Sequence, residues 1–485
     1  MTSTSQLSRD ISTPSVISQL NHSPGASRLE MATLSFFEQF RRMYVGESVG
    51  RMSRVYQRLS EVLGISDDLT VLGVFANKIV TNIKYWSSNE PILNRTLNLL
   101  SELSRGYTAM RKLIRLDDIQ FVLTNHNEEH FPFLATKVGT SSLSPARQAA
   151  EFRLRTSFYA SLARLLMVDL GENEDRFLKF MAPLTRSTNR LIVAVLSGGP
   201  SHMSPDEIKS AIVGLARDLR GLSSSLNTKS SYQMLLDWFY PMGFKLFGRA
   251  LELWSLDPIV NVSVLKLLAE IVHNRNGRLL FDPTVPTGYL LFTELSRVLT
   301  AFGLQLIPNT RELPKQSVYQ VKLKPIVAAL DALKVCLSGS FINFGVFSLF
   351  REESLEKAVE MGVQLMLCVD ESELQYYLEL RNRVIANLPV GRQQAMTKLF
   401  DKLMDEVEFN LAGKNRDKFT QNVSSFKLAL GEFVKSMYSK SSDDMDSSST
   451  AGGEAVRNGS AEQCASEYLC LSTAIIQTAG LGLVL

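Results

Sequence analysis

From Arg28 onward, apolar side chains recur every three or four positions, which is the spacing of one face of an α-helix. Four such stripes follow one another before residue 104, with Gly46 and Gly64 ending the first two and Pro91 opening the fourth. Together they predict a series of amphipathic helices. Their members are, in order, Leu29, Thr33, Phe36, Phe37, Phe40, Met43 and Tyr44; Val55, Leu59, Val62 and Leu63; Leu69, Leu72, Phe75, Ile79 and Ile83; and Ile92, Leu93, Leu97, Leu100 and Leu103.

Helix starts are also marked further along the chain. Ser144 stands before Pro145, and Ser204 stands before Pro205 with Glu207 three positions after it, which is the arrangement of a capping box. The alternation of apolar and polar residues that is typical of strands is not convincing in any segment. Later helices are predicted near 231–255, 258–274, 288–303, 314–338, 353–369, 374–388, 390–411 and 417–437.

We expect these helices to form antiparallel pairs because the turns between them are short. Helix starts near Arg28 and Asp68 lie 40 residues apart, a period that suits HEAT-type repeats. The length of 485 residues allows about three domains or one array. The prediction is an all-α, HEAT-repeat-like solenoid rather than a compact bundle, since so many helices rarely share one core. The solenoid is expected over 28–370, and its last helices, after a shortened join, over 371–437.

The two ends of the chain differ from this middle. Residues 1–27 hold eleven Ser or Thr and are expected to be a disordered lead, and 438–485 are expected to be a flexible acidic tail with an apolar end. Six acids and Arg457 alone lie in 441–485, so the preceding chain is net +8 although the whole chain is net +3. Because the bases of that body are scattered among acids, we interpret them as solvated helix faces.

Cysteines and hydropathy indicate an intracellular protein. The four cysteines form no C-x-x-C pair, and Cys336 and Cys368 sit in apolar stretches as small core residues would. Residues 1–20 lack the apolar core of a signal peptide. Residues 468–485 carry no charge, but they hold several polar residues and an acidic upstream flank. We interpret this segment as a disordered or non-native terminus rather than a membrane anchor.

One motif raises the question of metal chemistry. Residues 126–130, with His126, Glu129 and His130, match the H-x-x-E-H pattern of inverted zinc peptidases. That chemistry requires both histidines on one helical face. Pro132 follows closely, and 124–144 has the composition of a loop. We therefore interpret the residues as loop residues rather than as a zinc site.

No other constellation predicts catalysis, a metal or a cofactor, and the chain is not expected to be an enzyme. Glu172, Glu174 and Asp175 are interpreted as solvated acids between helices, and His273, beside Arg275 and Arg278, as a complement to a helix C-terminus. Gly198, Gly199 and Pro200 form a predicted turn, and His22 and His202 are isolated. The mixture of arginine and aromatic residues at 249–254 has core spacing, so nucleic acid is not an expected partner.

Several stretches resemble one known family. They are 156–160 with 165–171, 214–221 (GLARDLRG), 269–275 (AEIVHNR) and 337–347 (LSGSFINFGVF), with 34–40 and 414–422 towards the ends. They are similar to the exportin-7 family (Ran-binding protein 16) of the importin-β, or karyopherin, superfamily. The likeness covers roughly 28–370 and resumes over about 376–435.

The resemblance implies a superhelix that acts as a nuclear transport receptor and does no chemistry itself. Such receptors bind protein cargo together with Ran-GTP and shuttle between nucleus and cytoplasm. They cross the nuclear pore by docking the phenylalanine–glycine repeats of nucleoporins, and they release cargo when GTP is hydrolysed. Cooperative binding of two ligands to one receptor state explains the coupling.

The chain also departs from the family pattern. It resembles only the carboxyl-terminal part of the family's longer members, so the amino-terminal arch that carries their principal Ran contact is expected to be missing. A long segment is omitted between Asp370 and Tyr376, and the tail after Asp446 has no counterpart. We therefore assign no residue to Ran or cargo binding. The alternative function is a helical-repeat scaffold, a protein-binding module without transport activity.

Overall fold

The described part of the chain is helical. A computed structural model describes residues 24–44, 68–135, 145–196, 203–281 and 285–369, with a few single positions elsewhere. No strand occurs in these ranges, which confirms the all-α prediction. The expected lead before residue 24, helices within 371–437 and tail from 438, including 468–485, lie outside these continuous ranges.

Contacts divide the chain into two compact units, one of residues 1–309 with 328–362 and one of residues 310–327 with 363–485. The first unit holds most of the described helices. They are α3 (Pro24–Tyr44), α5 (Asp68–Tyr85), α6 (Glu90–Leu103), α7 (Tyr107–Leu113), α8 (Asp117–Thr124), η2 (Pro132–Leu134), α9 (Pro145–Met167), α10 (Glu174–Val195), α11 (Pro205–Ser225), α12 (Lys229–Phe239), α13 (Met242–Leu253), α14 (Pro258–Ile271), η3 (Arg275–Gly277), α15 (Thr287–Asn309) and α18 (Gly345–Phe350). The helices α17 (Lys324–Ser338) and α19 (Ser354–Leu367) each have most of their residues in it.

Local sequence signals explain where these helices begin. Asn89 caps α6, and its side-chain oxygen accepts a hydrogen bond from the backbone N–H of Ile92. Ser204 and Glu207 form the predicted capping box of α11. Asp257 caps α14 in the same manner. Each cap satisfies backbone N–H groups that the first helical turn leaves unpaired.

The apolar stripes face the core, with exceptions at Leu29, Phe36, Val62 and Leu69, which are exposed. The fourth predicted stripe is buried along α6 from Ile92 to Leu103. In α3, Leu34 and Phe40 are buried, whereas Leu29 and Phe36 are exposed. Most of the second stripe, around Val55 to Leu63, falls outside the described residues.

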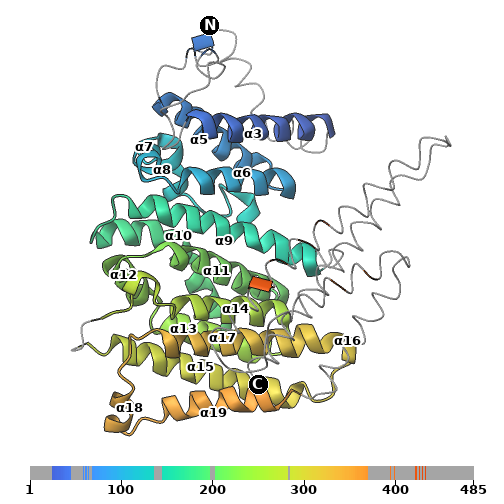
Figure 1. The fold of residues 1–485 in the computed structure, drawn as a ribbon, viewed down its shortest axis with the longest axis vertical. Helices are drawn as coiled ribbons and strands as arrows, with labels where there is room; N and C mark the ends of the chain where they lie inside the picture. Colours follow the sequence, from blue (N-terminus) through green and yellow to red (C-terminus); the bar gives the residue numbers. More distant parts are fainter. Residues whose placement is uncertain are drawn as a thin grey trace, which may run out of the picture. The chain divides into compact units, whose positions relative to one another are not determined.

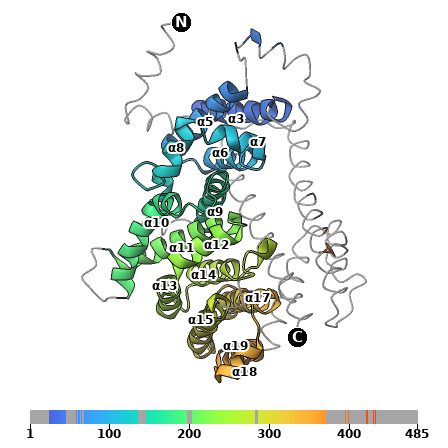
Figure 2. The same cartoon turned by 90° about the vertical axis from the view of Figure 1, so that its left-hand side faces the viewer.

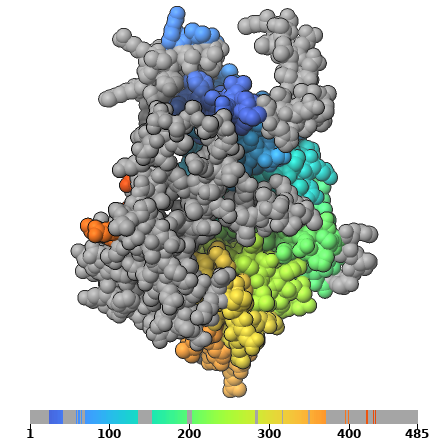
Figure 3. Space-filling model, turned by 90° about the vertical axis from the view of Figure 1, so that its right-hand side faces the viewer, coloured from blue at the N-terminus to red at the C-terminus, as the bar shows by residue number. Residues whose placement is uncertain are grey.

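Within the first unit, the helices stack in chain order as two layers (Figures 1 and 2). In what we call the inner layer, α6 packs on α3 and on α9, and α11 packs on α9 and on α14. In the outer layer, α8 packs on α5 and on α10, and α13 packs on α10 and on α15. The described residues form successive bands in the space-filling view (Figure 3). Stacking of this kind buries helix faces that no single pair could bury alone.

Neighbouring helices of the inner layer run in the same direction. Arg155 of α9 pairs with Asp218 of α11, and the next turn of α9, at Ala160, lies beside Gly221 of α11. At position 221 a Cβ atom would overlap the carbonyl oxygen of Thr156, so only glycine permits this approach of two helix backbones. The glycine-bearing stretch 214–221 thus acts as a packing surface.

One helix, α15, is long and apolar enough to cross a membrane by length and composition alone. Half of its most apolar window is buried inside the fold. Leu291, Leu295 and Phe302 contribute to that buried face, and α13 packs on the helix. We interpret α15 as a core helix of the array.

The predicted helical stretch near 231–255 is divided into two helices. The structure places two helices there, α12 ending at Phe239 and α13 beginning at Met242. Pro241 lies between them, and a proline has no backbone N–H to donate and its ring blocks the preceding turn. The predicted helix at 314–338 is instead three consecutive helical segments.

Those segments begin in the second unit, as α16 (Lys315–Val318), the π-helical turn η4 (Tyr319–Leu323) and the first turn of α17. Val318, Tyr319 and Leu323 form a small buried cluster there, against which Leu313 and Val369 pack.

Substitution of Gly221 by alanine should destabilise the first unit, because the added methyl group would push α9 away from α11. We expect the midpoint of thermal unfolding, followed by circular dichroism, to fall by several degrees, in line with an overpacking cost of about 1–3 kcal/mol. Gly73→Ala in α5 is the matched control, since a Cβ there meets only Leu116 at 3.9 Å. Equal midpoints for the two variants would contradict this account of the contact.

Candidate functional site

A groove of about 760 Å³ opens between the loop that follows α8 and the helices α9, α10 and α11. Several polar side chains line it, and concave sites of this size bind ligands or side chains. Its lining residues are His126, Asn127, Glu128, Glu129, Leu134, Arg155, Tyr159, Pro183, Leu184, Arg186, Ser187, Asn189, Arg190, Val193, Ala194, Met203 and Asp218.

A buried ion pair forms part of the groove wall. The Arg155 guanidinium donates from Nε to Asp218 Oδ1 at 2.8 Å, and its Nη2 lies 2.5 Å from Oδ2. Arg155 Nη1 donates to the carbonyl oxygen of Leu134 at 2.6 Å, so one side chain ties α9 to α11 and to the loop. Burial raises the pKa of Asp218, and the adjacent guanidinium opposes that shift.

The H-x-x-E-H segment borders the same groove, in a loop as expected for residues 125–135. His126 is buried, and its Nε2–H donates to the carbonyl oxygen of Phe180 at 2.9 Å. Its Nδ1 then accepts from the hydroxyl of Tyr159, 3.2 Å away. Because both ring nitrogens have protein partners, His126 holds the loop against α9 and α10.

The second histidine of the motif, His130, forms hydrogen bonds within the loop. His130 places Nδ1 2.9 Å from Asn127 Oδ1, which also accepts the His130 backbone N–H at 3.0 Å. Within the described residues, no three His, Cys, Asp or Glu side chains come together as a metal site would require. Both histidines of the motif thus have hydrogen-bond partners within the protein.

The groove rim consists of charged and apolar side chains of α10. Arg190 Nη2 lies 3.3 Å from Glu128 Oε1, with both side chains exposed. Arg186 is exposed one turn earlier, and Val193 is exposed one turn later. A groove with this rim can hold a side chain or a short peptide. Because both ring nitrogens of His126 are hydrogen-bonded, neither is available to act as a base.

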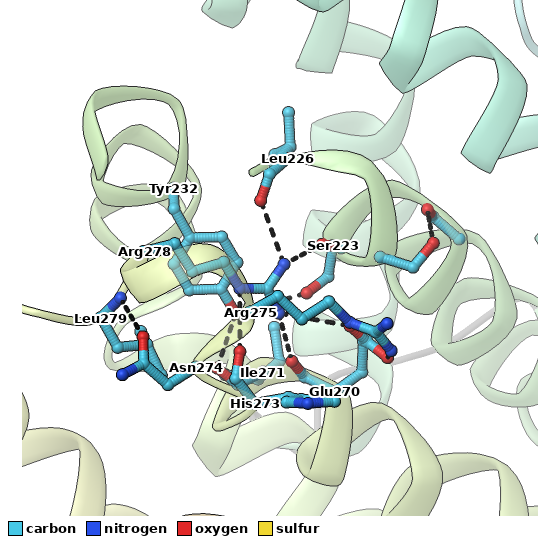
Figure 4. Close-up of polar contacts among 12 residues, drawn as sticks. Ser223, Leu226, Tyr232, Glu270, Ile271, His273, Asn274, Arg275, Arg278 and Leu279 are labelled. Carbon is cyan, nitrogen blue, oxygen red and sulfur yellow. Dashed lines mark hydrogen bonds and ion pairs between the residues drawn. The ribbon is translucent and has the colours of Figure 1, made fainter. Parts of the chain in front are cut away.

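A second buried polar cluster, which the sequence analysis missed, joins α11, α12 and α14 (Figure 4). At its centre is Arg278, which is completely buried. Its Nε donates to the His273 carbonyl, its Nη1 to the Ser223 and Leu226 carbonyls, and its Nη2 to Glu270. All five N–H donors of the guanidinium are satisfied, which a lysine could not reproduce.

Neighbouring groups complete this cluster (Figure 4). The Arg278 guanidinium lies 4.0 Å from the centre of the Tyr232 ring, and Glu270 also receives Nε and Nη2 of Arg275 at 2.9 and 2.8 Å. Burial raises the pKa of Tyr232 to about 12. His273 lies just beyond α14 as expected, but Arg278 uses its backbone carbonyl rather than its ring.

Other predicted residues have ordinary roles. Glu172, Glu174 and Asp175 are exposed, the last two in the first turn of α10. Cys336 is buried and Cys368 half-buried. Arg249 pairs with Glu252 at 2.7 Å. His22, His202 and the turn at 198–200 lie outside the described residues.

Comparison with known proteins places these features in a family context. A family profile described as the TPR domain of exportin-7-like proteins matches residues 9–142. Over 373 residues, or 77% of its length, the chain is 45% identical to exportin-7-B of Xenopus laevis. The chain is related to the exportin-7 proteins.

Two further relatives agree. Ran-binding protein 17 of Mus musculus is 45% identical over 353 residues, and Ran-binding protein 16 of Drosophila melanogaster is 41% identical over 357 residues, each match covering 73% of the chain. The chain spans about a third of the length of these exportin-7 relatives. The profile names tetratricopeptide-type rather than HEAT-type repeats for residues 9–142, and both are stacked helix pairs.

The exportin-7-like stretches of the sequence coincide with the contacts that join the inner helices. Residues 214–221 hold the two glycines and Asp218 of the α9–α11 contact, and 269–275 hold Glu270 and Arg275. Arg278, the centre of the second cluster, lies just after the latter stretch. The only signal for Arg278 in the sequence was its position close to Glu270 and Arg275 at the end of a predicted helix.

Substitution of Arg278 by methionine should lower the free energy of unfolding by about 3–5 kcal/mol. The substitution leaves buried carbonyl groups without a hydrogen-bond donor and removes a desolvated ion pair. Arg278→Lys should restore only part of the loss, since it supplies three donors. Thermal unfolding and amide exchange of α11 and α14 would measure both. Arg297→Met is the control, because Arg297 is half exposed and pairs only with Glu294 on its own helix. A midpoint that Arg278→Met leaves unchanged would contradict this role.

His126 should make stability depend on pH. Burial lowers its pKa from 6.5 to about 4, so the unfolded chain binds this proton first as the pH falls. Stability is thus fully present above pH 6.5 and is lost as the pH falls towards 4, by about 3 kcal/mol in all. His126→Gln should flatten the curve of unfolding free energy over this range relative to the parent chain. Parallel curves for the two proteins would show that His126 does not contribute.

Proposed function

We propose that this chain is part of an exportin-type nuclear transport receptor that carries protein cargo from the nucleus to the cytoplasm with Ran-GTP. The observation that carries the proposal is 45% identity to exportin-7-B over 77% of the chain. Two of the other relatives are named Ran-binding proteins. The two-layered helical array supports it, since such arrays present extended surfaces to protein partners.

The mechanism that we propose is linkage between ligands. Ran-GTP and cargo stabilise the same curvature of the array, so each raises the affinity for the other. GTP hydrolysis removes one ligand and thereby releases the second. This mechanism needs no reaction on the receptor, and we propose no enzymatic activity for it.

Passage through the nuclear pore is the second part of the proposal. Apolar side chains are exposed along the outer layer, from Val74 of α5 through Leu178 and Val193 of α10 to Leu253 of α13 and Leu304 of α15. Single exposed apolar residues are ordinary. Their recurrence on successive outer helices suits weak, repeated contacts with the phenylalanine–glycine repeats of nucleoporins. The receptor would shuttle between nucleus and cytoplasm.

The proposal is tested with the fluorescently tagged chain in permeabilised cells. We expect it to accumulate at the nuclear rim and to bind phenylalanine–glycine repeats on beads. Leu178→Glu with Leu253→Glu should reduce both signals several-fold. Leu29→Glu, at an exposed position of α3 outside the outer layer, is the control.

The outcomes separate the two functions that the sequence allows. No rim signal and no bead binding would contradict the transport proposal and favour a helical scaffold. Binding to Ran is measured in parallel, with Ran loaded with a non-hydrolysable GTP analogue or with GDP. A preference for the GTP form that increases in the presence of nuclear extract supports linkage, and equal binding of both forms argues against it.

A further inference from the structure

Arginines of the inner layer fall into two classes. In one class each arginine has a carboxylate partner: Arg41 pairs with Glu102, Arg95 with Glu38, Arg155 with Asp218, and Arg275 and Arg278 with Glu270. A second set, at or near α6, α9 and α11, has no ion pair among the described residues. We call it the unpaired arginine set, and its members are Arg105, Arg153, Arg164, Arg217 and Arg220.

Two of these side chains bridge neighbouring helices through hydroxyl groups alone. Arg164 of α9 donates to Ser104 and Ser101 at 3.1 and 3.0 Å, at the junction with α6. Arg217 of α11 donates to Ser263 of α14 at 3.3 Å. A hydroxyl neutralises no charge, so guanidinium groups that the fold partly desolvates keep their full charge without compensation.

The set forms two adjoining groups on one surface. Thr156 of α9 donates to the Arg217 carbonyl at 3.2 Å, which places Arg217 beside the turn of α9 that carries Arg153. Arg220 lies one turn beyond Arg217 on α11. Burial and the charges of Arg220 and Arg153 lower the pKa of Arg217 to about 10, and burial and Arg105 lower that of Arg164.

The spacing along α9 defines the length of a ligand. Arg153 and Arg164 are eleven positions apart, which is about three turns and about 16 Å, so they lie on the same helix face. Half-buried Ser157 lies on that face between them, and Thr156 and Ala160 lie at its edge, where they pack against α11. Small side chains of this kind let an extended chain lie close to the helix, and about five extended residues span the distance.

We propose that the unpaired arginine set is a binding site for an acidic polypeptide segment of a partner protein, whose spaced carboxylates pair with Arg153, Arg164, Arg217 and Arg220. Carboxylates match the guanidinium fork and form two hydrogen bonds with it. The site goes beyond the transport function proposed above and does not depend on it.

The surroundings favour a peptide over nucleic acid. Glu270 and Asp331 are close enough to Arg220 to act on its pKa. Such carboxylates repel a continuous phosphate backbone, whereas a peptide can place its acids away from them. The face between Arg153 and Arg164 also offers no aromatic ring, and single-stranded nucleic acid binds by stacking on such rings.

Binding of a fluorescent peptide to the full chain tests the proposal. The probe is a twelve-residue oligoglutamate, compared with a twelve-residue oligothymidylate and with an oligolysine. Fluorescence anisotropy at physiological salt should show that oligoglutamate binds more tightly than oligothymidylate and that oligolysine does not bind. Tighter binding of the oligothymidylate would overturn the proposal in favour of a nucleic-acid surface.

Matched variants separate this site from general attraction by a basic protein. Arg153→Gln with Arg164→Gln and Arg217→Gln should weaken oligoglutamate binding at least tenfold. Arg190→Gln with Arg249→Gln and Arg297→Gln removes the same charge from exposed positions and should weaken it less than threefold. An equal loss in both triple variants would overturn the site.

A single variant covers the risk that the first triple variant does not fold. Arg153 is exposed and forms no ion pair among the described residues, so Arg153→Gln should leave the thermal midpoint unchanged and weaken binding two- to fivefold. Unchanged binding by this variant would remove Arg153 from the site and contradict the proposal.

Discussion

The close parallel contact between α9 and α11 is the constraint on which the rest of the first unit depends. Gly221 allows the two backbones to meet at Thr156, and the Arg155–Asp218 pair fixes their register from inside the fold. The same register places Arg217 beside the turn of Arg153, and it sets Asp218 and Arg155 into the wall of the groove. A shift of one helix along the other would separate each of these pairs.

Buried charge marks the junctions of the array, and the way it is compensated differs from junction to junction. Glu270 neutralises Arg275 and Arg278, and backbone carbonyls take the remaining donors of Arg278. Arg164 and Arg217 face only hydroxyl groups. A cluster in which every polar group is hydrogen-bonded makes its helix junction rigid. A guanidinium group without a carboxylate partner can instead bind a negatively charged ligand. Compensated and uncompensated guanidinium groups thus occur within one layer of helices, and the α11–α14 junction holds both.

The transport by linkage that we propose needs this combination of properties. An array in which each helix contacts its neighbours transmits a change of curvature from one ligand to another, and it needs no catalytic group for that purpose. The buried His126 illustrates the point, because its two ring nitrogens hold a loop against α9 and α10 instead of serving a reaction.

Sequence by itself indicated the helices and the similarity to exportin-7 proteins. Periodic apolar positions and local caps such as Ser204 with Glu207 act over a few residues, so they can be recognised from the sequence alone. The break at Pro241 was missed because the apolar period continues on both sides of it. Only the tertiary structure decided that Arg278 is buried, that His126 faces Phe180 and Tyr159, and that Arg217 has no carboxylate partner among the described residues. Those properties depend on contacts between residues 33 to 55 positions apart, which come together only when neighbouring helices pack.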